Sequence, residues 1–129
     1  GRSTGEILRN QIEISREFSR RHSVWVVVKT FHSVVVVPDG TVFVSPRGNP
    51  GMASAGMGDV LTGILTSLIG QYAAVERNDP EEITQALCLG VFLHGLAGDL
   101  SAEDRGWETL VAGDLIDSLA DAYLLLEEQ

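Results

Sequence analysis

Residues 48 to 63, GNPGMASAGMGDVLTG, combine five glycines with one carboxylate, Asp59, and lead into an apolar segment. A loop that ends at a helix N-terminus presents unpaired backbone N–H groups and the positive end of the helix dipole, and such a place binds anions, above all phosphate. Glycines at 56 and 58 allow positive φ angles and a close approach of the backbone to a phosphate. A carboxylate in the first helical turn is stabilised in its charged form, which is the form that a general base needs. The stretch therefore predicts a phosphate at the loop amides and a reacting proton near Asp59.

The same stretch also has a purely structural interpretation. Glycine-rich turns between a strand and a helix are common, and an aspartate in a first turn is a favourable partner of the helix dipole. The pattern is not a Walker sequence, because no Gly-Lys-Ser/Thr follows, and it is not GxGxxG after a single strand. From these physical features alone, both interpretations stay open.

The elements before the loop follow from hydrophobic periodicity and turn chemistry. Residues 4–22 predict an amphipathic helix. Three strands are predicted over 24–30, 33–39 and 41–46, and the first two are continuous apolar runs that are typical of burial on both faces. The Pro-Asp-Gly sequence at 38–40 predicts a tight hairpin between the last two strands.

Three helices are predicted after the loop. One starts at about Ala55, and a second covers roughly residues 80–103 with Asp79 as its cap and Pro80 in its first position. That second helix is apolar nearly all round and rich in small residues, which indicates a buried and closely packed element. The last helix is expected over about 113–127.

Length and composition limit the class of protein. The chain has 129 residues, enough for one domain with a real core, and its 44 % hydrophobic and 21 % charged residues are typical of a soluble globular protein. We expect no membrane span, because no apolar run approaches about 18 residues, and the single Cys88 suits a reducing cytoplasm. A net charge of -9 argues against nucleic acid as a partner, but it is compatible with a small anionic ligand held by local donors.

The run NPGMASAGMGDVLTGIL closely resembles the glycine loop of the bacterial NAD(P)H-hydrate dehydratases, which are members of the ribokinase-like superfamily. Three further blocks, VVVKTFHSVVVVPDGTVFVSPRGNPGM, GVFLHGLAGDLSAE and VAGDLIDSLADA, are similar to blocks of the same family, so that essentially the whole chain is covered. The resemblance implies an α/β ribokinase-like layered fold. Residues 1–129 would then be the C-terminal part of a single domain, with three strands and flanking helices, and another chain or a missing segment would complete the sheet.

The resemblance also implies an activity. Enzymes of this family are carbon–oxygen lyases that repair hydrated NADH or NADPH, using ADP or ATP, with Mg²⁺ carried by the nucleotide and no metal site on the protein. Asp59 matches the catalytic aspartate, which would contact the hydrated nicotinamide and move a proton at the reacting hydroxyl. Ala55, Gly56, Met57 and Gly58 match the anion hole, whose amides would stabilise charge on the phosphoryl group.

The nucleotide-binding segment of the family, Lys-Gly-Ala-Gly-Thr, is similar to residues 29–33 of this chain. Lys29 is kept, and Ser33 keeps a hydroxyl where the family has Thr. Thr30, Phe31 and His32 replace three small residues, which changes the shape expected of the nucleotide site. Gly58 also matches a nucleotide contact.

The block LHGLAGDL contains His94 and Asp99. A histidine on a crowded helix is more often a hydrogen-bonded packing residue than a catalyst, because a buried ring needs a partner for its N–H. We therefore interpret both residues as structural.

The family domain is longer than this chain, and its first half carries the early strands and a His-Pro-Gly-Glu motif that meets the substrate. We expect the chain to pair with such an N-terminal half or to form a homo-oligomer, and we expect the isolated chain to be inactive. Two other functions stay open: a ribokinase-like small-molecule kinase, which shares the Gly-x-Gly-Asp loop, and a non-catalytic nucleotide-binding or assembly module. The Asn49-Pro50-Gly51-Met52 lead-in and the LHGLAGDL block favour the dehydratase over the kinase.

Overall fold

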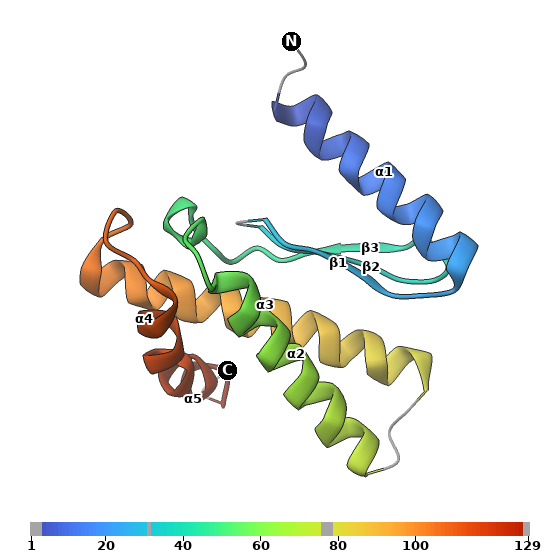
Figure 1. Ribbon diagram of the computed structural model, residues 1–129. Coiled ribbons are helices and arrows are strands. Elements are labelled where there is room, and N and C mark those ends of the chain that lie inside the picture. Colours follow the sequence, from blue (N-terminus) through green and yellow to red (C-terminus); the bar gives the residue numbers. More distant parts are fainter. Residues whose placement is uncertain (1–3, 31, 76–78, 128–129) are drawn as a thin grey trace.

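The computed structural model describes residues 4–30, 32–75 and 79–127, with the side chains of the first helix described from residue 10 onward (Figure 1). Phe31 lies outside the described residues. The fold is mixed α/β, as the resemblance implied, and it begins with a helix that is followed by a small sheet and then by further helices. In chain order the elements are α1 (Thr4–His22), β1 (Val26–Val28), β2 (Val34–Val36), β3 (Val42–Val44), the 3-10 helix η1 (Pro50–Met52), α2 (Met57–Ala74), α3 (Pro80–Arg105), α4 (Ala112–Asp117) and α5 (Leu119–Glu127).

The sheet is antiparallel with the strand order β1-β2-β3. Val35 at its centre pairs with Val27 on one side and with Phe43 on the other. All three residues of β2 are buried, as the apolar run predicted, whereas those of β1 are half-buried. The predicted hairpin between β2 and β3 is confirmed, and Gly40 takes the positive φ of 88° that its turn requires.

The strands are shorter than the apolar runs predicted, at three residues each. One cause lies after β1, where the side chains of Thr30 and Ser33 form local hydrogen bonds to backbone carbonyls. Such bonds compete with a sheet ladder and turn the chain. Backbone hydrogen bonds from Val37 to Thr41 and from Ser45 to Ser33 nevertheless extend the pairing of β2 and β3 at both ends.

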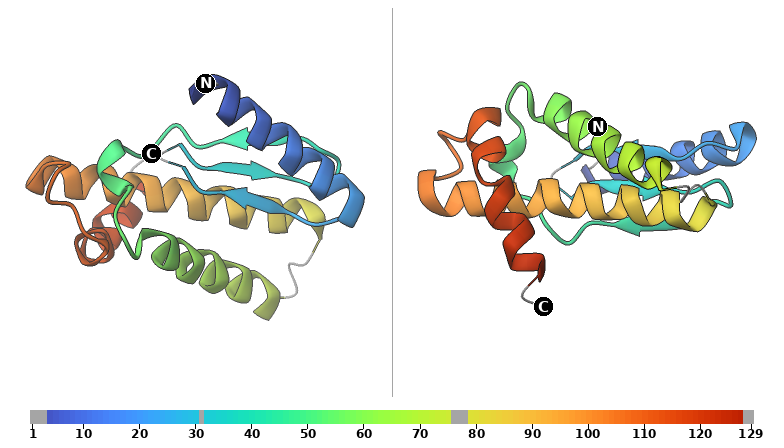
Figure 2. Two further views of the ribbon diagram at one scale, coloured as in Figure 1. Left: turned by 45° about the horizontal axis from the view of Figure 1, so that its top comes forward. Right: turned by 90° about the horizontal axis from the view of Figure 1, so that it is seen from below.

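Helices cover both faces of the sheet (Figure 2). On one side α1 packs against β1 and β2. On the other side α3 packs against β2, and α2 packs against α3. The hydroxyl of Ser19 on α1 lies within hydrogen-bond distance of the carbonyl oxygens of Val24 and Val37, at 2.6 and 2.8 Å, which fixes the helix over the sheet. The carboxyl end of β1, the loop after β3 and the start of α2 come together at one end of the sheet (Figure 1).

The long helix α3 forms the centre of the core. Asp79 caps it by accepting hydrogen bonds from the backbone N–H groups of Glu81 and Glu82, and Pro80 occupies the first turn, as predicted. Contrary to the sequence prediction, α3 is long and apolar enough to cross a membrane by length and composition. Core helices of soluble proteins pass the same test, and 56 % of the apolar window of α3 is buried inside the molecule.

The prediction of one continuous helix over 113–127 is wrong. The chain forms α4 and α5, which are separated at Ser118. The Ser101 hydroxyl on α3 lies 3.0 Å from the carbonyl oxygen of Asp114 and 2.8 Å from the hydroxyl of Ser118, and so holds this junction against the core helix.

Candidate anion-binding site

The glycine loop ends at the N-terminus of α2. The helix begins at Met57 rather than at residue 55, and Gly56 precedes it with a φ of 85° and no side-chain cap. Positive φ favours glycine, so the prediction for Gly56 is confirmed. The same prediction is wrong for Gly58, which lies inside the first helical turn. Because no side chain caps the helix at Gly56, its first amides are available to a ligand.

Two charged side chains flank this helix N-terminus. Asp59 lies in the first turn, as predicted, and its side chain is exposed. Lys29 follows β1 directly, and its Nζ donates a hydrogen bond of 3.2 Å to the carbonyl oxygen of Met52 in the loop. A methyl group added at Gly58 would lie 3.7 Å from Cδ of Lys29, so the lysine stem runs beside the start of α2. The ammonium group and the helix dipole both favour an anion here.

The remaining residues of the segment that resembles a nucleotide site form a local turn. Thr30 Oγ1 donates to the carbonyl oxygen of His32 at 2.6 Å, and Ser33 Oγ donates to the carbonyl oxygen of Thr30 at 3.0 Å. The Ser33 side chain is buried, whereas His32 is exposed. A nucleotide contact through the Ser33 hydroxyl would therefore require its bond to Thr30 to open.

The loop is fixed to α3 from behind by a group of hydrogen bonds that we call the Asn49–Asp99 clasp. The Asn49 amide nitrogen donates to the carboxylate of Asp99 and to the carbonyl oxygen of Gly98, both at 3.0 Å. The other carboxylate oxygen of Asp99 accepts from the backbone N–H of Gly48 at 3.1 Å, and the amide oxygen of Asn49 accepts from Gly51 at 3.0 Å. The start of the loop is thus tied both to itself and to the helix.

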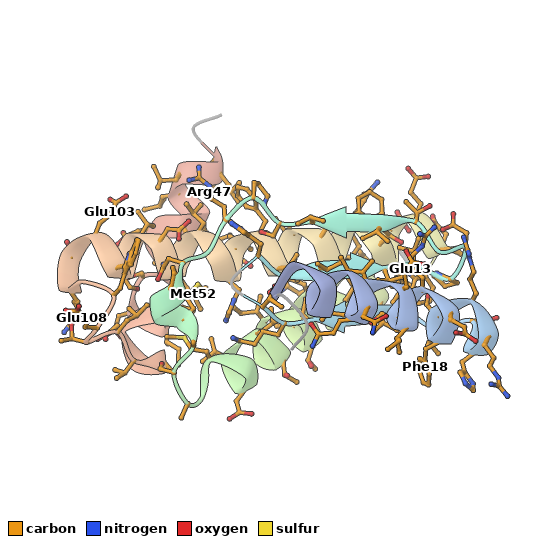
Figure 3. All side chains as sticks on the ribbon, turned by 90° about the horizontal axis from the view of Figure 1, so that it is seen from above. Glu13, Phe18, Arg47, Met52, Glu103 and Glu108 are labelled. Carbon is orange, nitrogen blue, oxygen red and sulfur yellow. The ribbon has the colours of Figure 1, made fainter. Side chains whose placement is uncertain are left out.

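Two glycines of α3 let the loop approach this helix closely. A Cβ atom at Gly95 would lie 2.7 Å from the backbone of Arg47, and one at Gly98 would lie 2.4 Å from the sulfur of Met52. Figure 3 shows Met52 between the loop and α3, where its side chain is buried. The small residues that predicted close packing therefore serve the loop that leads to the site.

His94 of α3 contacts the first turn of α2. Its Nε2 lies 2.9 Å from the carbonyl oxygen of Met57, and the side chain is 1 % exposed. Burial lowers the pKa of His94, and the positive charge of Lys29 lowers it further, against the opposing effect of the hydrogen bond to Met57. The imidazole is therefore neutral near pH 7.

The sequence did not assign Asn49, His94 or Asp99 to the site, and it interpreted the last two as structural. The structure supports this interpretation, since all three hold the backbone of the loop or of α2. The sequence did single out the segments that contain these residues, because the Asn49 lead-in and the LHGLAGDL block were the two features that favoured the dehydratase over the kinase. Their contact across about 50 positions of sequence was not visible.

Comparison with known proteins identifies relatives of the chain. A family model described as NAD(P)H-hydrate dehydratase (Carb_kinase) matches residues 2–121. The bifunctional NAD(P)H-hydrate repair enzyme Nnr of Moorella thermoacetica is 40 % identical over 129 residues, which is 100 % of this chain and 23 % of the relative. The ADP-dependent (S)-NAD(P)H-hydrate dehydratase of Neisseria meningitidis is 33 % identical over 122 residues, which is 95 % of this chain and 38 % of the relative.

A solved structure shares the fold. The ADP/ATP-dependent NAD(P)H-hydrate dehydratase of Bacillus subtilis, co-crystallised with ATP and Mg²⁺, matches with a TM-score of 0.77 and 27 % identity, over 94 % of this chain and 41 % of that one. The fold is a ribokinase-like α/β module whose glycine loop ends at a helix N-terminus. The chain belongs to the NAD(P)H-hydrate dehydratase family. It spans less than half the length of these relatives.

Proposed function

We propose that the chain is the C-terminal part of a cytoplasmic enzyme domain that dehydrates hydrated NADH or NADPH at the expense of ADP or ATP. One observation carries the proposal: the uncapped N-terminus of α2, the exposed Asp59 and the stem of Lys29 lie together at the end of the glycine loop. This arrangement combines donors for a phosphoryl group with a base beside them. Family membership supplies the substrate class.

The proposed reaction requires that the hydroxyl of the hydrate become a better leaving group. The hydroxyl oxygen forms a bond to the terminal phosphorus, the bond from that phosphorus to the nucleotide breaks, and Asp59 accepts the hydroxyl proton. The carbon–oxygen bond then breaks, and phosphate departs with the bonding electrons while the ring nitrogen supplies a pair to form an iminium ion. Loss of a proton from the neighbouring ring carbon to water then forms the ring double bond and restores the reduced nicotinamide. The amides of residues 55–58 and the ammonium of Lys29 stabilise the charge on the phosphoryl oxygens.

Among the described residues, no three His, Cys, Asp or Glu side chains lie together as a metal site. Mg²⁺ carried by the nucleotide is part of the proposal. The Mg²⁺ ion would neutralise the phosphate charge that remains after the interactions with Lys29 and the helix dipole.

We also propose that other protein completes the sheet. Within the described residues β1 and β3 each pair with β2 alone, so that β1 presents an unpaired backbone edge beside half-buried valines. Exposed apolar edges favour aggregation. An N-terminal segment like that of the longer relatives would cover this edge, and sedimentation of the chain with and without such a segment tests the idea. A chain that is monomeric and soluble alone would count against it.

The function is tested by joining the chain to the N-terminal part of the Bacillus subtilis relative that it does not match. We expect this fusion to restore the near-ultraviolet absorbance of reduced nicotinamide from hydrated NADH with ADP and Mg²⁺, and the chain alone to be inactive. Asp59→Asn should lower the rate by about 10²- to 10⁴-fold, which is typical of lost acid–base catalysis, while nucleotide binding persists. Near-wild-type turnover by this variant would remove Asp59 from the mechanism.

A non-catalytic nucleotide-binding module is the second candidate. The Thr30 and Ser33 hydroxyls are used in internal hydrogen bonds, which counts against the nucleotide contacts that catalysis would need and so favours a non-catalytic binding or assembly role. A correctly folded fusion that binds ADP but gives no turnover would favour this module over the dehydratase.

A further inference from the structure

We propose that His94 is a positioning residue that aims the backbone N–H of Gly58 at the anion. This inference deepens the proposed function and rests on it, because the anion in question is the phosphoryl group of the nucleotide. It assigns to the LHGLAGDL block a role at the site without any contact between His94 and a ligand. A single peptide group, which joins Met57 to Gly58, connects the imidazole of His94 to this N–H group.

The geometry starts from the hydrogen bond between His94 Nε2 and the carbonyl oxygen of Met57, at 2.9 Å. A carbonyl oxygen only accepts hydrogen bonds, so Nε2 carries the proton and donates it. The ring is 1 % exposed and neutral, hence this tautomer is fixed without competition from water. The donor is therefore permanent in the folded chain.

The carbonyl of Met57 and the N–H of Gly58 belong to the same peptide group. Because a peptide group is planar and trans, its C=O and N–H point in opposite directions. Fixing the Met57 oxygen towards His94 fixes the Gly58 N–H in the direction of the helix N-terminus, where the first amides of α2 are free. A donor on the carbonyl oxygen also polarises the peptide group, which makes its N–H a stronger donor.

The backbone hydrogen bonds of α2 also hold this turn, and His94 adds a side-chain bond to them. Gly56 has no side chain to cap the helix, and Gly58 lacks a Cβ atom that could pack against a neighbour and hold the turn. Lys29 fixes the carbonyl of Met52, five residues before Met57, and this hydrogen bond does not involve the peptide group of Met57. His94 is the described side chain that fixes the peptide group from which an anion-hole amide extends.

The test compares two variants of the 129-residue chain, His94→Gln and His94→Leu. Both lack the aromatic ring and have similar volumes, but only glutamine offers an N–H group at the place of Nε2. We expect His94→Leu to shift the ¹⁵N resonance of the Gly58 amide and to weaken ADP binding in calorimetry by roughly tenfold, the loss of about one hydrogen bond. His94→Gln should retain the wild-type resonance position and bind ADP within about threefold of wild type. Thermal unfolding of both variants controls for loss of structure.

The outcomes separate this inference from the proposed function. ADP binding that is equal in the wild type and in both variants would overturn the role of His94 and leave the proposed function intact. A wild-type chain whose Gly58 amide does not respond to ADP would count against the phosphate site itself and against the inference with it. If His94→Leu does not fold, the ¹⁵N spectrum of histidine in the wild-type chain decides, because a ring protonated on Nδ1 instead of Nε2 would overturn the proposal.

Discussion

Removal of the Asn49–Asp99 clasp should destabilise the chain by an amount that follows from its hydrogen bonds. The carboxylate of Asp99 accepts from Gly48 and from Asn49, and hydrogen bonds to charged groups contribute about 1.5–3 kcal/mol each. Because Asp99 is half-buried, we use the lower end of that range. Asp99→Ala should therefore lower the free energy of unfolding by about 3 kcal/mol. For a chain of this size, the melting temperature should fall by roughly 10 °C.

A double-mutant cycle with Asn49→Ala isolates the shared bond. Each single variant removes the Asn49–Asp99 hydrogen bond. The loss in free energy of unfolding in the double variant should therefore be smaller than the sum of the two single losses, by at least about 1 kcal/mol. Urea unfolding at neutral pH measures all four chains. Asp104→Ala, at an exposed position of the same helix, is the control and should change stability by less than about 0.5 kcal/mol. Losses that add within about 0.3 kcal/mol would refute the coupling and with it the clasp.

Three further predictions concern glycine and pH. Gly58→Val should abolish ADP binding in calorimetry while the fold persists, since the new side chain meets only the flexible stem of Lys29. Gly95→Ala should destabilise by about 1–3 kcal/mol, because its methyl group meets backbone at 2.7 Å, whereas Gly63→Ala, with open space around it, should stabilise by roughly 1 kcal/mol. The pKa of His94 lies below its ordinary value of 6.5, so the unfolded chain binds the proton first as the pH falls. Stability should therefore decline below about pH 6.5 and level off below the folded pKa, and His94→Gln should flatten this slope in urea titrations.

The sequence predicted the helices well where a local signal marks their ends. The predicted bounds of α1 were right. The start of α3 was also right, because the cap Asp79 and the first-turn Pro80 act within one helical turn. The break between α4 and α5 was missed, since neither glycine nor proline marks it. It is held by a hydroxyl from α3, and a contact across 17 residues leaves no trace in local periodicity. The strand ends were missed for a related reason, because runs of valine do not show where pairing stops.

The site shows the same division between local and distant information. The first-turn place of Asp59 and the positive φ of Gly56 follow from the loop sequence, because both are properties of one turn. The wrong prediction for Gly58 shows that the same residue type serves a different need one position inside the helix: there the missing Cβ leaves the amide open, and the backbone stays helical. The peptide group of that amide is held through the Met57 carbonyl by His94, 37 residues from Met57 along the chain. A sequence motif at a helix N-terminus therefore identifies the backbone N–H donors, but the helix packed against it determines the direction in which they point.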